Sequence, residues 1–252
     1  IEGVDRQHKV AIVKFAGDMT EKVGNDQYRQ GQYWYNYSQV VKGLTDCSGG
    51  KATDLKNKID EIKPAGATQA DYGLELARDI PSGRAGAKKI VVFFTDGKPT
   101  SYSEFDSKVA NDAVTAAKDM KDSKATVYTI GIFSGADPTA DPSKKGTSDV
   151  NKFMHAVSSN YPSATSYTSD MLGARVENSD YYKSATNADE LKKVFDDISK
   201  AITSEAPHPT EIHKGYDATK SGYITFTDEL GDFMQVDGFI YNGTTFDKPT
   251  KT

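Results

Sequence analysis

The sequence has 252 residues, which is enough for one large domain or for a domain with a small annex. Its formal charge of −5 gives no electrostatic footprint for nucleic acid or for an anionic membrane, and we expect neither as a partner. No apolar run approaches the roughly 20 residues of a transmembrane helix, so we expect no membrane insertion. Cys47 is the single cysteine, which excludes an internal disulfide.

The first part of the chain predicts one strand and two helices. Residues 8–16 (HKVAIVKFA) have the apolar content of a strand. Residues 53–62 carry apolar side chains at helical spacing, with Thr53 as the expected N-cap. The breaker PAGAT at 64–68 separates this helix from a second one over about 69–80.

Residues 24–38 (GNDQYRQGQYWYNYS) differ from their surroundings because they are rich in Gln, Asn and Tyr and almost free of aliphatic side chains. One interpretation is a solvated loop that is held by packed tyrosines. The other is a projecting arm used in recognition, because Tyr and Trp supply large and rigid contact areas. The aromatic residues of this arm are Tyr28, Tyr33, Trp34, Tyr35 and Tyr37.

A purely apolar run closed by Thr-Asp-Gly predicts the central strand of an open α/β sheet at 88–94. Asp96 stands at the carboxyl end of this strand, where such folds place ligands. A common alternative for an Asp-Gly pair is a simple turn. We expect the strand to be buried on both faces.

The order of the remaining elements alternates between helix and strand, which indicates a parallel α/β sheet. The expected elements are a helix at 104–121, a strand at 125–133, a short helix at 152–158, a strand at 181–185 and a helix at 187–203. Asn187 and Glu190 form the capping pattern of the last helix.

The character of the sequence changes near residues 204–208. From 221 to 246 short apolar runs alternate with turns, with strands expected at 223–226, 233–236 and 239–241, and Asn242-Gly243 predicts a hairpin. About 45 residues are too few for an independent β domain. We therefore expect 205–252 to be part of a β-rich domain completed by sequence outside this chain.

Two oxygen donors stand out by their position at the edge of the predicted sheet. Thr68 lies in the loop that enters a helix, and Asp96 follows the central strand. A hydroxyl and a carboxylate from neighbouring loops suit a hard cation such as Mg²⁺, which binds oxygen ligands and keeps several waters.

The runs VAIVKFAG, GAT and VVFFTDG resemble a von Willebrand factor A domain. The later runs ATVYTIGIF, KFMHAVSSNYP and DYYKSATNADELKKVFDDISKAI, and the tail GYITFTDELGDFMQV, are similar to those of tip adhesins from Gram-positive pili. The resemblance implies a Rossmann-like doubly wound fold over 1–204, with inserted arms near 24–50 and 134–178, followed by part of a stalk domain at 205–252.

The resemblance also implies a metal-ion-dependent adhesion site, with Thr68 and Asp96 as its second and third elements. Its first element, Asp-x-Ser-x-Ser, is not matched, because the nearest look-alike at 46–50 (DCSGG) follows the wrong strand and lacks the last Ser. We therefore expect this chain to lack the first strand and helix of the domain. The missing strand would lie beside the strand at Ile90.

The implied function is a non-enzymatic adhesion module on a cell-wall-anchored, extracellular pilus. Its expected partners are a host extracellular-matrix or cell-surface protein and other pilin subunits, with Mg²⁺ or another divalent cation as cofactor. One alternative is a structural pilus subunit with a silent metal site. A less favoured one is a metal-dependent α/β hydrolase using Asp96, which would need a second acid and a phosphate cradle that the sequence does not show.

Overall fold

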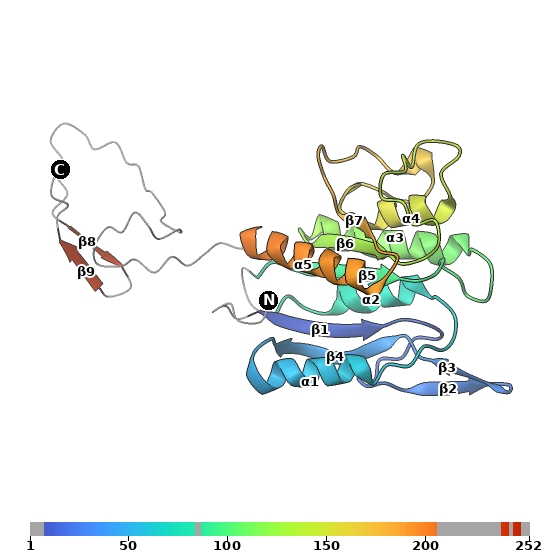
Figure 1. Ribbon diagram of the computed structural model, residues 1–252, viewed down its shortest axis with the longest axis horizontal. Helices are drawn as coiled ribbons and strands as arrows, with labels where there is room; N and C mark the ends of the chain where they lie inside the picture. Colours follow the sequence, from blue (N-terminus) through green and yellow to red (C-terminus); the bar gives the residue numbers. More distant parts are fainter. Residues whose placement is uncertain (1–7, 84–86, 206–237, 242–243, 248–252) are drawn as a thin grey trace. The chain divides into compact units, whose positions relative to one another are not determined.

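The computed structural model describes residues 8–83, 87–205, 238–241 and 244–247. The chain divides into two compact units, Ile1–Thr203 and Ser204–Thr252. The first unit is an α/β fold with a parallel sheet between helices, which confirms the predicted fold class (Figure 1).

The described strands of the first unit form three separate ladders. β1 (Lys9–Lys14) pairs antiparallel with β4 (Gln39–Asp46), and β2 (Gln27–Gln30) forms a hairpin with β3 (Tyr33–Asn36). The parallel sheet has the order β5-β6-β7, with β5 at Ile90–Thr95, β6 at Thr126–Gly131 and β7 at Tyr182–Ser184.

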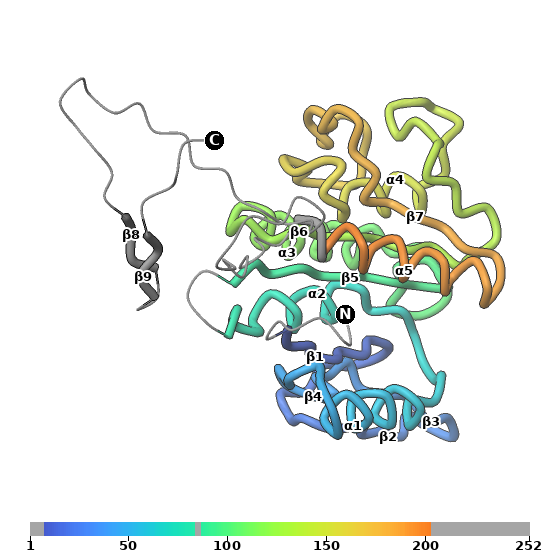
Figure 2. Tube along the Cα trace, turned by 60° about the vertical axis from the view of Figure 1, so that its left-hand side comes forward, coloured from blue at the N-terminus to red at the C-terminus, as the bar shows by residue number. Residues whose placement is uncertain are grey.

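Helices cover both faces of the parallel sheet, as in a doubly wound fold. The helices are α1 (Gly49–Asp60), α2 (Ala70–Asp79), α3 (Ser107–Asp122), α4 (Asp149–Val157) and α5 (Ala188–Glu205), with one 3₁₀ turn, η1, at Ser169–Met171. Side chains of α2, α3 and α4 bury one face, and α5 packs against Tyr128 and Ile130 of β6 on the other. Figure 2 shows α5 running along β5.

Three aromatic rings in the main core connect the β1–β4 ladder with the parallel sheet. Phe15, directly after β1, stacks on Phe93 of β5 with ring centroids 5.0 Å apart. Phe93 in turn meets Phe153 of α4 edge-on at 6.1 Å. This contact fixes the carboxyl end of β1 against the carboxyl half of β5.

The predicted cap of the last helix is confirmed. The side chain of Asn187 accepts a hydrogen bond from the backbone N–H of Glu190 at 2.9 Å. The Glu190 carboxylate accepts from the backbone N–H of Thr186, so the two side chains satisfy donors at the helix start.

Other predictions of local structure were wrong in informative ways. β4 was not predicted, because Lys42, Gly43 and Thr45 interrupt its apolar run. α1 begins at Gly49 rather than at 53, and Ser48 takes the N-cap position that was expected for Thr53.

β5, the strand that was predicted to be central, lies at one end of the described parallel sheet and is not buried on both faces. The side chain of Phe94 is 44% exposed, and Ile90 and Val92 are half-buried. Within the described residues β5 pairs with β6 alone, so its second edge carries no neighbouring strand to bury these side chains.

The second unit is described only as a hairpin. β8 (Gly238–Tyr241) pairs antiparallel with β9 (Thr244–Asp247), and Tyr241 stands opposite Thr244. This antiparallel pairing confirms the predicted hairpin, and Asn242-Gly243, on which the prediction rested, lie outside the described residues. The strands predicted at 223–226 and 233–236 lie outside the described residues.

Candidate functional site

The carboxyl ends of β1 and β5 meet at the loop that enters α2. The backbone N–H of Gln69 donates to the carbonyl of Ala16, just after β1, at 2.9 Å. Thr68 exchanges two backbone hydrogen bonds with Thr100, both of 3.0 Å, which ties the same loop to the one that follows β5. The sequence-predicted loops of Thr68 and Asp96 are therefore joined at one edge of the sheet.

The hydroxyl of Thr68 lies against the backbone beside Asp96. A β-carbon built on Gly97 would stand 3.4 Å from Thr68 Oγ1. The turn itself is held by Thr95, whose hydroxyl donates to the carbonyl of Gly97 at 3.0 Å and accepts from its N–H at 3.2 Å. Asp96 is therefore not needed to hold the turn through its side chain.

Among the described residues, neither the Thr68 hydroxyl nor the Asp96 carboxylate has a hydrogen-bond or ion-pair partner in the protein. Asp96 is exposed and Thr68 is half-buried. Hard oxygen donors without a partner are suitable ligands for Mg²⁺. In the described part of the chain, no group of three or more His, Cys, Asp or Glu residues completes such a site. The donor chemistry therefore fits a hydrated divalent ion, held by two protein ligands.

Asp71 is a charged residue at this edge that the sequence did not single out. It lies in the first turn of α2, three residues after Thr68, and its side-chain atom Oδ1 is buried without a partner among the described residues. Burial raises the pKa of Asp71 to about 6, and the nearby Glu75 and Asp112 carboxylates add to the shift. The sequence signal was an Asp at a predicted helix start, which by itself indicates only a favourable interaction with the helix dipole.

The base of the β2–β3 hairpin is fixed to the loop that leads to Thr68. The backbone N–H of Asn36 donates to the carbonyl of Ala65 at 3.1 Å, and the Asn36 side-chain amide donates to the carbonyl of Lys63. Gly66 has a φ of +108°, and a β-carbon there would lie 2.9 Å from the Tyr35 ring. The hairpin and the Thr68 loop therefore form one connected structure.

The five aromatic residues of the arm divide into anchors and an exposed tip. Tyr28 stacks on Tyr35 and tilts against Tyr37, with centroids 5.6 and 4.5 Å apart, and its hydroxyl accepts from the Asp18 N–H at 3.0 Å. Tyr33 and Trp34 are 62% and 60% exposed at the turn of the hairpin. The segment is thus a strand hairpin (Figure 1) that is held by packed tyrosines and has two exposed aromatic side chains, and its use in recognition stays a prediction.

A family model described as von Willebrand factor type A domain matches residues 2–175. The chain belongs to this family. No curated protein matches the chain. Among solved structures, the pilus adhesin SpaC from Lactobacillus rhamnosus GG is 15% identical with a TM-score of 0.46, and the match covers 77% of this chain. A conserved hypothetical protein, BatB from Bacteroides thetaiotaomicron, is 16% identical with a TM-score of 0.43 over 79% of this chain and 81% of its own.

The A-type chain described here spans 25% of the length of the SpaC chain. Both TM-scores are low, so the two likenesses do not contribute to the assignment of function.

Tyr167, in the second segment predicted to be an inserted arm, contacts the loop that follows β5 and the start of α3. The ring of Tyr167 meets Phe105 edge-on at 5.1 Å, and its hydroxyl lies 3.0 Å from the hydroxyl of Ser107 at the start of α3. The backbone N–H of Asp106 donates to the carbonyl of Pro99, in the loop after Asp96. Segment 158–178 therefore packs beside the loop that carries Asp96.

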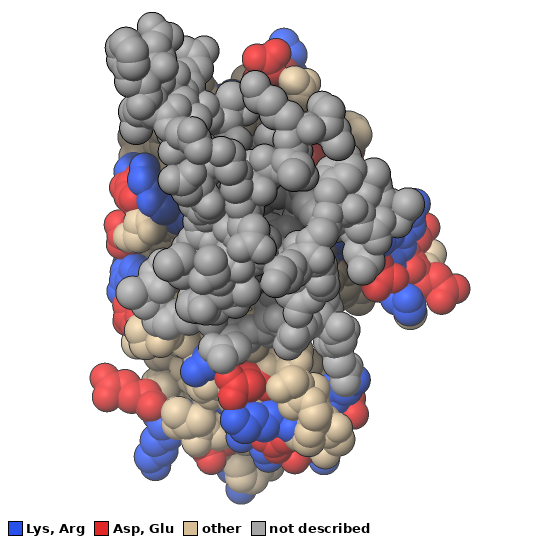
Figure 3. All heavy atoms as spheres, turned by 90° about the vertical axis from the view of Figure 1, so that its left-hand side faces the viewer, with Lys and Arg blue, Asp and Glu red and all other residues tan. Residues whose placement is uncertain are grey.

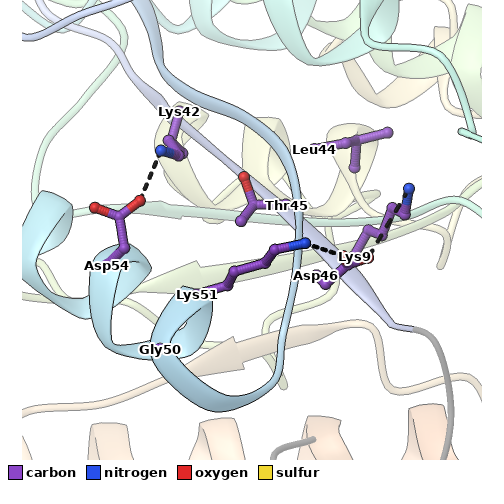
Figure 4. A pocket seen from close by; sticks show the side chains of 8 residues that line it. All are labelled: Lys9, Lys42, Leu44, Thr45, Asp46, Gly50, Lys51 and Asp54. Atoms are coloured by element: carbon purple, nitrogen blue, oxygen red, sulfur yellow. Dashed lines mark hydrogen bonds and ion pairs between the residues drawn. The ribbon is translucent and has the colours of Figure 1, made fainter.

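A charged groove lies between α1 and the ladder of β1 and β4. It is lined by Lys9, Lys42, Leu44, Thr45, Asp46, Gly50, Lys51 and Asp54 (Figure 4). Lys42 pairs with Asp54, and Lys51 pairs with Asp46, each with a nitrogen–oxygen distance of 2.6 Å. Because these charges satisfy one another, the groove offers no unpaired group to a ligand.

The surface charges of the described residues are mixed in sign. On the face drawn in Figure 3, basic and acidic side chains lie interspersed wherever the figure colours them. None of the described helices is both long enough and apolar enough to span a bilayer.

Proposed function

We propose that this chain is an adhesion module of a bacterial surface pilus, which binds a host protein through a divalent metal site and the aromatic arm. The observation that supports this proposal is the pairing of two features on one loop. Among the described residues, neither the Thr68 hydroxyl, which lies beside Gly97, nor the carboxylate of the adjoining Asp96 has a protein partner, and the hairpin with its exposed Tyr33 and Trp34 is fixed to the Thr68 loop.

In this proposal Thr68 and Asp96 are the protein ligands of Mg²⁺. The ion would supply an electrophilic centre whose remaining positions accept water or a carboxylate of the bound protein. Two protein ligands with a single negative charge hold such an ion weakly. The affinity of this chain for Mg²⁺ alone should therefore be low, and a ligand carboxylate should raise it.

The aromatic tip would provide most of the apolar contact with the host protein. Exposed aromatic side chains on a rigid support lose little conformational entropy on binding. The three anchoring tyrosines and the backbone bonds of Asn36 supply that support. We assign to the host side an extracellular-matrix or cell-surface protein with an accessible carboxylate.

The location and remaining partners follow from the resemblance of the sequence to pilus adhesins. We propose an extracellular position on a cell-wall-anchored pilus of a Gram-positive bacterium, with other pilin subunits as neighbours and a role in host attachment and virulence. The hairpin of β8 and β9 belongs to the unit that would join the module to the stalk.

The small number of metal ligands favours one competing function, a structural pilus subunit with a silent site. A metal-dependent hydrolase is a weaker competitor, since no group of three or more His, Cys, Asp or Glu residues gathers in the described part of the chain.

Asp96→Ala tests the proposal, with Asp60→Ala as a matched loss of one exposed carboxylate at the end of α1. Calorimetric titration with Mg²⁺ and adhesion to immobilised collagen and fibronectin, with and without chelator, are the measurements. Asp96→Ala should abolish both Mg²⁺ binding and chelator-sensitive adhesion, whereas Asp60→Ala should keep both.

Full adhesion by Asp96→Ala would place binding in the arm alone, and absence of adhesion by the unmodified chain would favour the structural subunit. Metal-dependent cleavage of a generic phosphoester would favour the hydrolase.

A further inference from the structure

The two faces of the β2–β3 hairpin carry different side chains. Residues that stand directly opposite each other in an antiparallel pair share one face. Arg29 stands opposite Trp34, so these two side chains share a face, which we call the Arg29 face. Gln27 and Asn36, two positions along each strand, lie on the same face. The other face, the tyrosine face, carries Gln30 and three tyrosines.

Near the base of the hairpin, the tyrosine face packs against the rest of the protein. Tyr28 stacks on Tyr35 and tilts against Tyr37. The ring of Tyr35 also lies against Gly66, where a β-carbon would stand 2.9 Å from it. The exposed side chains of the Arg29 face are those of Gln27, Arg29 and Trp34. A partner therefore has access to the Arg29 face, while the tyrosine face supports it.

The guanidinium group of Arg29 is oriented by the turn and keeps free donors. Its Nε donates to the carbonyl of Gly31 at 2.9 Å. Gly31 has a φ of +62°, which glycine adopts in a hairpin turn without strain. Among the described residues, no carboxylate pairs with Arg29, and its two Nη groups make no hydrogen bond. A guanidinium group that is oriented in advance loses less freedom on binding, and its donors match the two oxygens of a carboxylate.

The charge of the arm limits the kind of partner that fits the Arg29 face. Arg29 is the only charged residue in 27–38, and Trp34 beside it is 60% exposed. One guanidinium group next to a large flat ring suits one acidic side chain next to an apolar one. A sulfated polysaccharide would need an array of basic groups, whereas this arm has one and the whole chain carries a formal charge of −5. The charge pattern favours an acidic polypeptide.

We propose that Arg29 is a specificity-determining residue of the arm, and that with Trp34 it binds a polypeptide segment in which Asp or Glu adjoins an apolar residue. This inference rests on the proposed adhesive function and adds a second acidic group to the partner, besides the carboxylate that would reach the metal. The contact of Arg29 with a carboxylate does not need the metal ion. The two contacts can therefore be separated with a chelator.

The fluorescence of Trp34 tests this contact directly, because Trp34 is the only tryptophan of the chain. The probe is a synthetic peptide in which leucine alternates with aspartate, titrated into the full chain in the presence of chelator. The matched peptide has asparagine in place of aspartate. The aspartate peptide should shift the emission in a saturable way, and the asparagine peptide should bind on the order of tenfold more weakly. No emission change with the aspartate peptide, or equal affinities of the two peptides, would overturn the proposal without any variant.

Substitutions of Arg29 give an independent readout. Arg29→Gln should weaken binding of the aspartate peptide on the order of tenfold, to the level of the asparagine peptide. Arg29→Lys should keep part of the affinity, because the charge remains and the two-pronged geometry is lost. Lys193→Gln, which removes one exposed charge from α5, should bind as the unmodified chain does. Full affinity in a folded Arg29→Gln would overturn the contact. Arg29-dependent binding of a heparin fragment that is tighter than binding of the aspartate peptide would overturn the polypeptide partner.

Adhesion to immobilised fibronectin separates this inference from the proposed function. With Mg²⁺ present, Arg29→Gln should lower adhesion severalfold, and Lys193→Gln should not. Full adhesion by Arg29→Gln, together with loss of adhesion by Asp96→Ala, would overturn the role of Arg29 in specificity and support the metal site. Absence of adhesion by the unmodified chain would contradict the proposed function, whereas the peptide titration decides the Arg29 contact by itself.

Discussion

The hydroxyl of Thr68 lies beside Gly97, 3.4 Å from the position that a β-carbon on that glycine would occupy. This contact joins a loop that begins after α1 to one that begins after β5. It places a hydroxyl next to the residue, Asp96, whose carboxylate the turn leaves free. The contributions of Thr68 and Asp96 to metal binding can therefore be tested by separate substitutions.

Thr68→Val should weaken Mg²⁺ binding on the order of tenfold, because it removes one oxygen ligand and keeps the side-chain volume. The backbone bonds to Thr100 should persist, so the melting temperature should change little. Calorimetric titration measures the affinity. Thr115→Val on the exposed side of α3 is the control, and an unchanged affinity in Thr68→Val would remove Thr68 from the site.

Gly66→Ala should lower the free energy of unfolding by about 1–2 kcal/mol, because the φ of +108° at Gly66 disfavours any β-carbon. The new methyl group would also lie 2.9 Å from the ring of Tyr35 and push the arm away from the Thr68 loop. Urea denaturation measures the change. Gly43→Ala, which has open space around the new β-carbon, should change stability far less.

Trp34→Ala and Tyr33→Ala should weaken adhesion to an immobilised matrix protein severalfold and leave the melting temperature unchanged, because both side chains are exposed. Tyr28→Ala should instead lower the melting temperature, because its ring holds the hairpin base. Tyr102→Ala removes an aromatic residue that is 87% exposed and is the control for non-specific adhesion through exposed aromatic rings. A tip variant with full adhesion would show that the arm does not contact the host protein.

The position of Thr68 and Asp96 at one edge of the sheet could be predicted from the sequence. Thr68 precedes helix α2 and Asp96 follows strand β5, and both elements have a clear apolar pattern. The burial of Asp71 could not, since it depends on α3 packing across α2 and no local pattern records that contact. β4 was not predicted, because polar residues interrupt its apolar pattern. The strand forms nevertheless, since its backbone pairs with β1. The exposure of Phe94 was missed for a related reason, since burial of a strand is decided by its neighbours.

Lys121→Met should lower the free energy of unfolding by about 1–3 kcal/mol, because it removes a buried donor and leaves the carbonyl of Ala156 without one among the described residues, while the carbonyls of Ser158 and Tyr161 each keep a backbone donor. The Lys121 Nζ group donates to the carbonyls of Ala156, Ser158 and Tyr161 at 2.7, 3.3 and 2.9 Å. Lys118→Met on the same helix, which breaks only an exposed pair with Asp122, should cost less than about 0.5 kcal/mol. Equal losses in the two variants would contradict this role.

Asp71→Asn should change how stability depends on pH. Burial raises the pKa of Asp71 to about 6 in the folded chain, above the ordinary value of 3.8. The folded state therefore holds the proton more tightly than the unfolded state does. The stability that this proton contributes is fully present below pH 3.8 and is lost as the pH rises through about 6.

Asp71→Asn removes this loss, because the amide stays neutral at every pH. The free energy of unfolding of the variant, relative to the unmodified chain, should rise by about 1 kcal/mol between about pH 5 and pH 8. Urea denaturation at several pH values measures this difference. Asp60→Asn, at an exposed position, is the control for the loss of one charge. A difference that falls with rising pH would show that a nearby cation holds the Asp71 carboxylate in its charged form.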